Sequence, residues 1–401
     1  MQLTPRTALL QFAHVCQQEL FPMLEAVLDG VSDQLELVVS IVSLVPLGKL
    51  LNASRAGTGR PAKDRTALAT AFIAKAVLGL PTTRDLIDRL KVDRGLRQLC
   101  GWRSEAGIPH ESKFSRAFAE FAANQLPQRL HEAMIENTQK ERLIGHIARD
   151  STAITGREQI PEAVMEEKRE KRKGRERKPS ANGKRGRPKG SVTLKAKKKK
   201  VKASERESRL ERQPHQTLEA MLADLPTQCD IGAKKTKNGE NQYWTGFKLH
   251  LDVADGQIPI SAILTSASVH DSQVAIPLMT LSGKRVDYLY ELMDSAYDAN
   301  HIHAHSRKLN HVAIIATHPR RGSQQPSQLP KVFPAELAPE MTWAQKERFK
   351  ERTMVERVYS RLKDEFGANQ VRVRGAAKVM AHLMFGVLAL AVDQWLRILQ
   401  Q

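Results

Sequence analysis

The alternation of apolar and polar residues in the stretch W-T-G-F-K-L-H-L-D-V (244–253) constrains the fold of this chain most. Because successive side chains of a strand point to opposite faces, the pattern predicts a strand with one apolar and one polar face. The two faces carry Phe247, Leu249, Leu251 and Val253, and Lys248, His250 and Asp252, respectively. Asp255-Gly256 then precedes a second apolar run, I-P-I-S-A-I-L-T, so we predict an antiparallel hairpin.

Two other short apolar runs each end in an aspartate. The run L-I-G-H-I-A-R-D predicts a strand with Asp150 near its C-terminal end, and Tyr288 to Met293 predicts a strand followed by Asp294. A helix over 303–308 and a strand over 311–317 come next, and then a Pro- and Gln-rich loop. This order of elements predicts an α/β fold, with a mixed sheet flanked by helices.

Residues 1–140 have a helical pattern. Arg65 to Leu80 is an apolar helix closed by Gly79 and Pro81, and a helix opened by Ser112 carries phenylalanines at helical spacing. We expect an all-helical N-terminal domain that binds DNA ends, a second copy of the chain, or both.

The positive charge is concentrated in one segment. The chain has a formal net charge of +19, and the residues from Lys168 to Arg212 hold 21 Lys and Arg against 5 Asp and Glu. Such a segment favours a polyanionic partner, either nucleic acid or an anionic membrane surface. Because it lacks the aromatic and apolar residues of a core, we predict that 156–240 is a basic, largely disordered insertion.

Within this insertion, K-R-G-R-P-K-G (184–190) resembles an AT-hook. The glycine would let the backbone approach the floor of the A·T minor groove, with Arg185 and Arg187 reaching along it. A generic basic linker that binds phosphates without regard to sequence is the alternative.

Several other classes of protein are disfavoured. Cys16, Cys100 and Cys229 lie far apart, which argues against a zinc knuckle or a disulfide framework and suits a reducing cytoplasm. The first residues lack the pattern of a signal peptide. The apolar run Val379 to Val392 contains His382 and stops at Asp393, so we predict a buried helix and no membrane partner.

The stretch from Phe349 to Phe366 predicts a single helix, because it lacks Pro and Gly and is followed by Gly367. Its apolar residues fall on one side, and beside them lies a strip with Arg352, Glu356 and Lys363. A solvated charged face is the ordinary interpretation of such a strip. The two strand-end aspartates favour another one.

Three carboxylates that met at two strand ends and a packed helix would repel each other, unless cations compensated them. Mg²⁺ prefers oxygen ligands, and two such ions about 4 Å apart can hold the attacking and leaving oxygens of a phosphoryl transfer. Arg352 and Lys363 would then lie against DNA phosphates.

The spacing of these residues resembles a signature of the DDE transposases of bacterial insertion sequences. That signature is Tyr, Arg, Glu and Lys with gaps of two, three and six residues, and this chain has Phe349, Arg352, Glu356 and Lys363 at that spacing. Phe349 in place of Tyr loses a hydroxyl. Other stretches similar to the family are A-R-D-S-T (148–152), Y-W-T-G-F-K-L-H (243–250), L-T-S-A-S-V-H-D-S (264–272), M-D-S-A-Y-D (293–298) and G-R-P (59–61).

The resemblance implies an RNase H-like catalytic domain formed by 141–155 and 241–401. It implies Asp150, Asp294 and Glu356 as catalytic residues and ligands of two Mg²⁺ ions, for which Mn²⁺ could substitute. The expected reaction is cleavage of transposon ends and strand transfer into target DNA. We expect Arg352, Lys363, Lys248, Arg185 and Arg187 to contact DNA, and a homodimer on DNA at the nucleoid of a bacterial cytoplasm.

Two alternatives stay open: an RNase H-like nuclease without strand transfer, and a non-catalytic DNA-binding protein derived from a transposase. Two further residues have ordinary interpretations. Asp271 before Ser272 predicts a helix N-cap without a catalytic role, and His250 predicts a surface histidine or one with satisfied hydrogen bonds.

Overall fold

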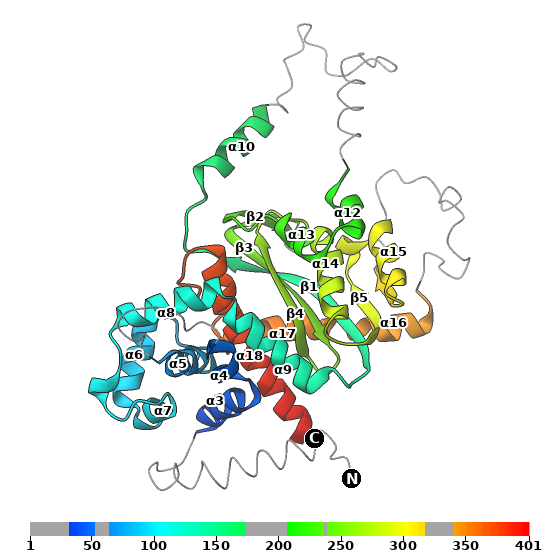
Figure 1. Cartoon of the computed structure of the whole chain (residues 1–401). Coiled ribbons are helices and arrows are strands. Elements are labelled where there is room, and N and C mark those ends of the chain that lie inside the picture. The colour runs from blue at the N-terminus through cyan, green and yellow to red at the C-terminus, as the bar shows by residue number, and fades with distance from the viewer. Residues whose placement is uncertain (1–31, 53–63, 174–206, 236–238, 317–340, 401) are drawn as a thin grey trace, which may run out of the picture.

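The computed structural model describes residues 32–52, 64–173, 207–235, 239–316 and 341–400. Within these ranges a six-stranded mixed sheet lies at the centre of the molecule (Figure 1), in the order β2-β3-β1-β5-β6 with β4 paired to β3. The strands are β1 (Ile144–Thr155), β2 (Asp230–Lys235), β3 (Asn241–Ala254), β4 (Ile258–Ser266), β5 (Tyr288–Met293) and β6 (Val312–Ile315). Strands β1, β5 and β6 run parallel, whereas β2, β3, β4 and β1 pair antiparallel.

The predicted hairpin is strands β3 and β4. Their turn holds Gly256 at φ 80°, a left-handed conformation that glycine adopts at little cost. The alternation of β3 is present, but its polar face is not solvated, because His250 and Asp252 are both fully buried. Helices therefore cover both faces of the sheet.

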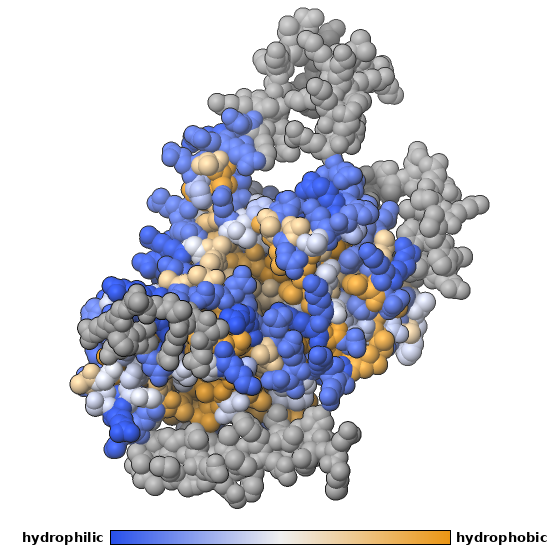
Figure 2. All heavy atoms as spheres, in the orientation of Figure 1, coloured by the Kyte–Doolittle hydropathy of each residue, from blue (hydrophilic) through white to orange (hydrophobic). Residues whose placement is uncertain are grey.

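One layer of helices packs on the face that carries His250 and Asp252. It contains α13 (Leu218–Ala223), α14 (Ser272–Gly283) and α15 (Asn300–Lys308). On the other face lie α16 (Trp343–Lys350), α17 (Thr353–Asp364) and α18 (Ala376–Gln400). Figure 2 shows that hydrophilic residues cover most of one side of the molecule, while hydrophobic residues are visible over the middle of the sheet.

The N-terminal region is helical, as predicted. Its elements are α3 (Asp33–Leu44), α4 (Leu47–Asn52), α5 (Arg65–Val77), α6 (Thr83–Val92), α7 (Arg94–Leu99), η1 (Glu105–Gly107), α8 (Glu111–Ala123) and α9 (Leu126–Gln139). The phenylalanines of α8 are buried, and Phe72 of α5 stacks on Phe385 of α18 with ring centroids 6.1 Å apart. Apolar residues of this region and of the sheet thus form one continuous core.

Helix α18 joins the two parts of that core. By length and composition it could cross a membrane, but 67% of its most apolar window is buried inside the structure, against α5, α8, α9 and β4. The predicted buried helix is thus present, although Asp393 does not end it. The Asp393 carboxylate accepts hydrogen bonds from Arg361 at 2.6 Å and Arg397 at 2.8 Å, which satisfy it within the helix surface.

The prediction that 156–240 is a largely disordered insertion is wrong for residues 207–235, which form regular elements. Helix α12 (Arg209–Arg212), the short helix η2 (Gln213–His215) and α13 pack against α14, and β2 pairs with β3. Leu218, Met221 and Cys229 are buried there. Helix α10 (Glu162–Lys173) extends away from the sheet, and Lys168 reaches back to pair with Asp230 of β2. Arg185 and Arg187, the AT-hook-like segment and the G-R-P of 59–61 lie outside the described residues.

The predicted fold class is therefore confirmed: an RNase H-like mixed sheet between helices follows a helical N-terminal region. The strand order places β1 between the antiparallel hairpin and the parallel pair β5-β6. Asp150 lies on β1, so its surroundings depend on both neighbours.

Candidate functional site

Asp150 and Asp294 come together at the point where β5 leaves the sheet. The parallel ladder of β1 and β5 ends with the pair Arg149 and Met293, and the two aspartates are the residues that follow this pair along the chain. The sequence predicted Asp150 near the C-terminal end of its strand, and this is wrong. Strand β1 continues to Thr155, paired with β3 alone. The loss of the β5 neighbour, rather than the end of a strand, opens space beside its carboxylate.

Few hydrogen bonds compensate these two carboxylates. Oδ1 of Asp150 accepts from the backbone N–H of Ser151 at 2.7 Å, and Oδ1 of Asp294 accepts from the N–H of Ala296 at 2.9 Å, which caps turn η3 (Ser295–Tyr297). Burial raises the pKa of Asp150 to about 6, and the nearby charge of Asp294 adds to the effect. Burial also raises the pKa of Asp294, with the charge of Asp271 adding to it.

The helix predicted over 349–366 is two helices. Helix α16 ends at Lys350 and α17 begins at Thr353, with a turn at Glu351 and Arg352. Short-range hydrogen bonds close this turn, from Arg352 N–H to the Phe349 carbonyl at 3.0 Å and from Met354 N–H to the Glu351 carbonyl at 3.0 Å. The break moves the Arg352 side chain toward β1.

Arg352 lies between two of the predicted catalytic carboxylates. Its Nη2 donates to Oε1 of Glu356 at 2.9 Å, and its Nη1 is 3.6 Å from Oδ2 of Asp150. The Glu356 side chain remains 56% exposed, although this bond to Arg352 holds its carboxylate. The structure thus brings Asp150 and Asp294 together and joins Glu356 to them through an arginine. Among the described residues, no three His, Cys, Asp or Glu side chains are gathered closely enough to form a metal-binding group.

The inner face of α17 fixes the backbone of Asp150. The buried hydroxyl of Tyr359 donates to the Asp150 carbonyl at 2.6 Å and accepts from the N–H of Leu251 at 3.0 Å. One turn farther along, Nζ of Lys363 donates to Oγ1 of Thr152 at 2.7 Å. The sequence pattern identified Tyr359 only as an apolar-face residue, although a buried hydroxyl requires a partner.

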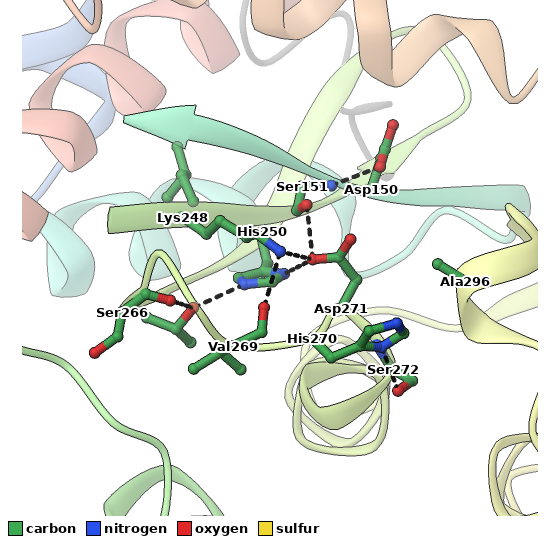
Figure 3. A network of polar contacts seen from close by, with 12 residues as sticks. Asp150, Ser151, Lys248, His250, Ser266, Val269, His270, Asp271, Ser272 and Ala296 are labelled. Atoms are coloured by element: carbon green, nitrogen blue, oxygen red, sulfur yellow. Dashed lines mark hydrogen bonds and ion pairs between the residues drawn. The ribbon is translucent and has the colours of Figure 1, made fainter. Parts of the chain in front are cut away.

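Asp271 is not an N-cap with its side chain, so that prediction is wrong. Its carboxylate makes no capping hydrogen bond to α14. Oδ1 instead accepts from Oγ of Ser151 at 2.9 Å and from Nζ of Lys248 at 2.9 Å, and Nδ1 of His250 lies 4.0 Å away. Figure 3 shows Asp150 and Ser151 pointing to opposite sides of β1, with Asp271 on the side of Ser151.

Lys248 and His250 belong to this same cluster and do not lie on the surface. Lys248 also donates to the Val269 carbonyl at 2.8 Å, so both of its bonds are internal. Nε2 of the buried His250 ring is hydrogen-bonded to Oγ1 of Thr265 at 3.0 Å, but its Nδ1 has no hydrogen-bond partner among the described residues. The satisfied-histidine interpretation therefore holds for one ring nitrogen only. Burial lowers the pKa of His250 to about 4, which keeps the ring neutral at pH 7.

A second set of buried charges lies one residue before Asp150. Arg149 is fully buried and donates two hydrogen bonds of 2.7 Å to Asp252, whose Oδ2 also accepts from Oγ of Ser282 at 2.6 Å. Glu291 of β5 lies 3.8 Å from Arg149 and accepts from the hydroxyl of Tyr288 at 2.6 Å. This network ties β1, β3, β5 and α14 together behind the two aspartates.

The donor set fits a hard divalent cation. Two neighbouring carboxylates are half-buried with raised pKa values, and the largely exposed Glu356 is joined to one of them through Arg352. Carboxylate oxygens are the ligands that Mg²⁺ prefers, and a cation would compensate the buried negative charge, whose burial is the main reason that both pKa values are raised.

Comparison with protein families gives two matches that together span most of the chain. A family model described as a transposase DDE domain matches residues 141–392, and one described as a transposase domain matches residues 23–120. No curated protein and no solved structure matches the chain. The first model covers more than half of the sequence, and its limits enclose β1, β5 and α17.

Proposed function

The chain belongs to the transposase DDE-domain family, and we propose that it cleaves the ends of a transposon and joins them to target DNA at the site around Asp150. A transposase function and DNA as the partner follow from the family. The proposal adds the residues and the chemistry. Its main support is the meeting of Asp150 and Asp294 beside a largely exposed Glu356, with too few partners for the charge they bury.

Asp150, Asp294 and Glu356 would hold two divalent ions, Mg²⁺ or in its place Mn²⁺. When bound, such ions activate a water or a 3′ hydroxyl as nucleophile and stabilise the leaving oxygen of an in-line displacement. The protein contributes the geometry. Tyr359 fixes the backbone of Asp150, and the Ser151 N–H orients its carboxylate. Both aspartates are therefore prearranged before DNA arrives.

Arg352 has two roles in this proposal. Its guanidinium lies between Asp150 and Glu356 and partly neutralises them. If cations held these carboxylates, Arg352 would be free to bind a DNA phosphate, which suits its planar group. Lys363, held on Thr152 along the same side of β1, is placed for the next phosphate.

Asp271 acts as a positioning residue. Its carboxylate accepts a hydrogen bond from the hydroxyl of Ser151, the residue whose N–H holds the Asp150 carboxylate, and Lys248 donates to Asp271 in turn. We therefore assign Lys248 to this internal support and no longer to DNA contact. Asp271 thereby influences the orientation of Asp150 from the opposite side of the strand.

The test is Asp294→Asn assayed on DNA that carries the terminal sequences of the element. Cleavage and joined products should both be lost, while DNA binding and folding persist, because Asn keeps the shape but not the charge of a metal ligand. An Asn variant that cuts near the parent rate would overturn the assignment. Cleavage by the parent without joined products would identify a nuclease. Binding by the parent without cleavage in Mg²⁺ or Mn²⁺ would identify a non-catalytic protein.

A further inference from the structure

A cleft of about 630 Å³ separates the N-terminal helices from the catalytic part of the chain. One wall consists of α5, α6 and α8, and the other contains Arg157, which follows β1, and Arg372, which follows α17. The two walls fall in the two segments that the family models match separately. The cleft has no part in the chemistry described above.

Lys75 of α5 is the unusual residue of this cleft. The residue is only 8% exposed, yet no hydrogen bond or ion pair joins its ammonium group to any residue that the structure describes. The acidic residue that acts on its charge is Asp85, whose carboxylate already accepts hydrogen bonds from the N–H and the hydroxyl of Thr82. Burial lowers the pKa of Lys75 to about 8. The ammonium group lines the cleft at the end of a buried stem and has no partner among the described residues, so this position suits an anion that enters the cleft.

The other charged side chains that line the cleft are also mostly positive. Lys75, Arg84, Arg157 and Arg372 contribute four cationic groups, against one carboxylate from Glu111, which pairs with Arg84 at 3.4 Å. His382 also lines the cleft, but burial lowers its pKa to about 4 and its Nε2 is bonded to the Gly367 carbonyl at 3.0 Å. The cleft therefore offers one buried and several exposed positive charges to a ligand.

The cleft lies beyond the end of the strand that carries Asp150. Strand β1 continues from Asp150 to Thr155, and Arg157 stands in the bend two residues later, so the two residues are at most about 23 Å apart at roughly 3.3 Å per residue. Thr152 and its partner Lys363 lie between the two points along the chain. Because duplex DNA rises 3.4 Å per base pair, no more than about seven base pairs separate the site from the cleft.

Resting on the proposed function, we propose that this cleft binds a phosphodiester group of the DNA that extends from the catalytic site. Lys75 is its central contact, and Arg157 and Arg372 hold the same strand from the opposite wall. One strand would thereby contact both segments of the protein at a fixed distance from the scissile bond.

The first test is Lys75→Met, which keeps most of the stem and removes the charge. Binding to a linear duplex without any terminal repeat should weaken about tenfold, and the slope of log affinity against log salt should flatten by about 0.9. Thermal stability should hold or rise, because an unpaired buried charge is removed. The matched control is Lys91→Met on α6, which is exposed and paired with Asp88 at 3.4 Å.

An unchanged salt slope in folded Lys75→Met, or an equal change in Lys91→Met, would overturn the proposal. If Lys75→Met does not fold, Arg372→Gln decides, since Arg372 is exposed and its loss leaves the core intact. It should flatten the slope by a similar amount, and an unchanged slope would again overturn the site.

Amine labelling tests the source of the phosphate. Lys75 should be protected from acetic anhydride by duplex DNA but not by inorganic phosphate or a mononucleotide at the same phosphate concentration, with Lys91 as the internal reference. Equal protection by inorganic phosphate would show a site for free phosphate and refute the DNA contact. Both measurements record binding, so a failure of cleavage would refute the proposed function and leave this result standing.

Discussion

Arg149 and Asp150 are consecutive residues of one strand, and their charges are buried in opposite ways. Arg149 is surrounded by Asp252 and Glu291, and each of these acids has a further hydrogen-bond donor. Asp150 has one backbone N–H and an arginine at 3.6 Å, and burial raises its pKa to about 6. The contrast separates a charge buried to hold the sheet together from a charge left short of partners where a ligand binds.

The largest expected effect is a loss of stability on substitution of Arg149, whose buried charge has partners. Arg149→Met leaves Asp252 and Glu291 buried without their cation, so unfolding by urea should show a loss of about 3–5 kcal/mol. Arg142→Met is the matched control, since Arg142 pairs with Asp255 at a partly exposed site. It should cost about 1 kcal/mol or less. Equal losses in the two variants would remove the distinction between the networks.

On the other side of the comparison, removing the charge of Asp150 should stabilise the metal-free protein. The folded-state pKa is raised from 3.8 to about 6, so the stability that protonation gives is present below pH 3.8 and is lost as pH rises through about 6. Asp150→Asn should thus gain roughly 2–3 kcal/mol over the parent by pH 7, and little at pH 4. Melting curves of both proteins with a chelator would measure this. A constant difference across that range would contradict the shift.

A smaller effect is expected when Asp271 is substituted. Asp271→Asn should lower cleavage and raise the Mg²⁺ concentration for half-maximal rate, each by roughly 10–100-fold, as for the outer partners of metal ligands. Ser151→Ala should act through the same contact, so the double variant should lose less than the two effects combined. A purely structural role would lower stability without changing the metal dependence.

The smallest effect should come from Lys363. Lys363→Ala removes a phosphate contact and leaves the carboxylates in place, so cleavage should fall by about tenfold, far less than in Glu356→Ala. The salt slope of DNA binding should flatten by about 0.9. If Lys363→Ala loses activity as completely as Glu356→Ala while it stays folded, Lys363 has a catalytic role.

Much of the fold was predicted correctly because the sequence of each of these elements favours its own structure. The strand Tyr288–Met293 and the turn at Gly256 have the predicted bounds, and the apolar side of α17 is buried as its spacing required. Strand β2 was missed because D-I-G-A-K-K has hardly any apolar alternation. Its regular structure comes from pairing with the first half of β3, a contact that its own sequence does not reveal.

The site shows the same limit. Asp271 before Ser272 has the pattern of a helix cap, whereas its partners Ser151 and Lys248 lie 120 and 23 residues away. No Pro or Gly marks the break at Arg352, where the side chain turns toward Asp150. The sequence could nominate Asp150, Asp294 and Glu356 from their places on two strands and a helix. It could not predict which buried charges would find partners, because that depends on tertiary packing.

The most direct measurement is cleavage of the polypeptide by bound iron. Fe²⁺ in place of Mg²⁺, with ascorbate and peroxide, produces radicals that cut the chain beside the metal. The proposed site predicts cuts near Asp150, Asp294 and Glu356 that Mg²⁺ suppresses and that Asp294→Asn abolishes. The chain near Ser282 on α14, whose hydroxyl donates to Asp252 in the Arg149 network, should be cut no more than background. Cuts elsewhere, or cuts at these three places that survive in Asp294→Asn, would contradict the claim that these carboxylates are left short of partners in order to bind metal.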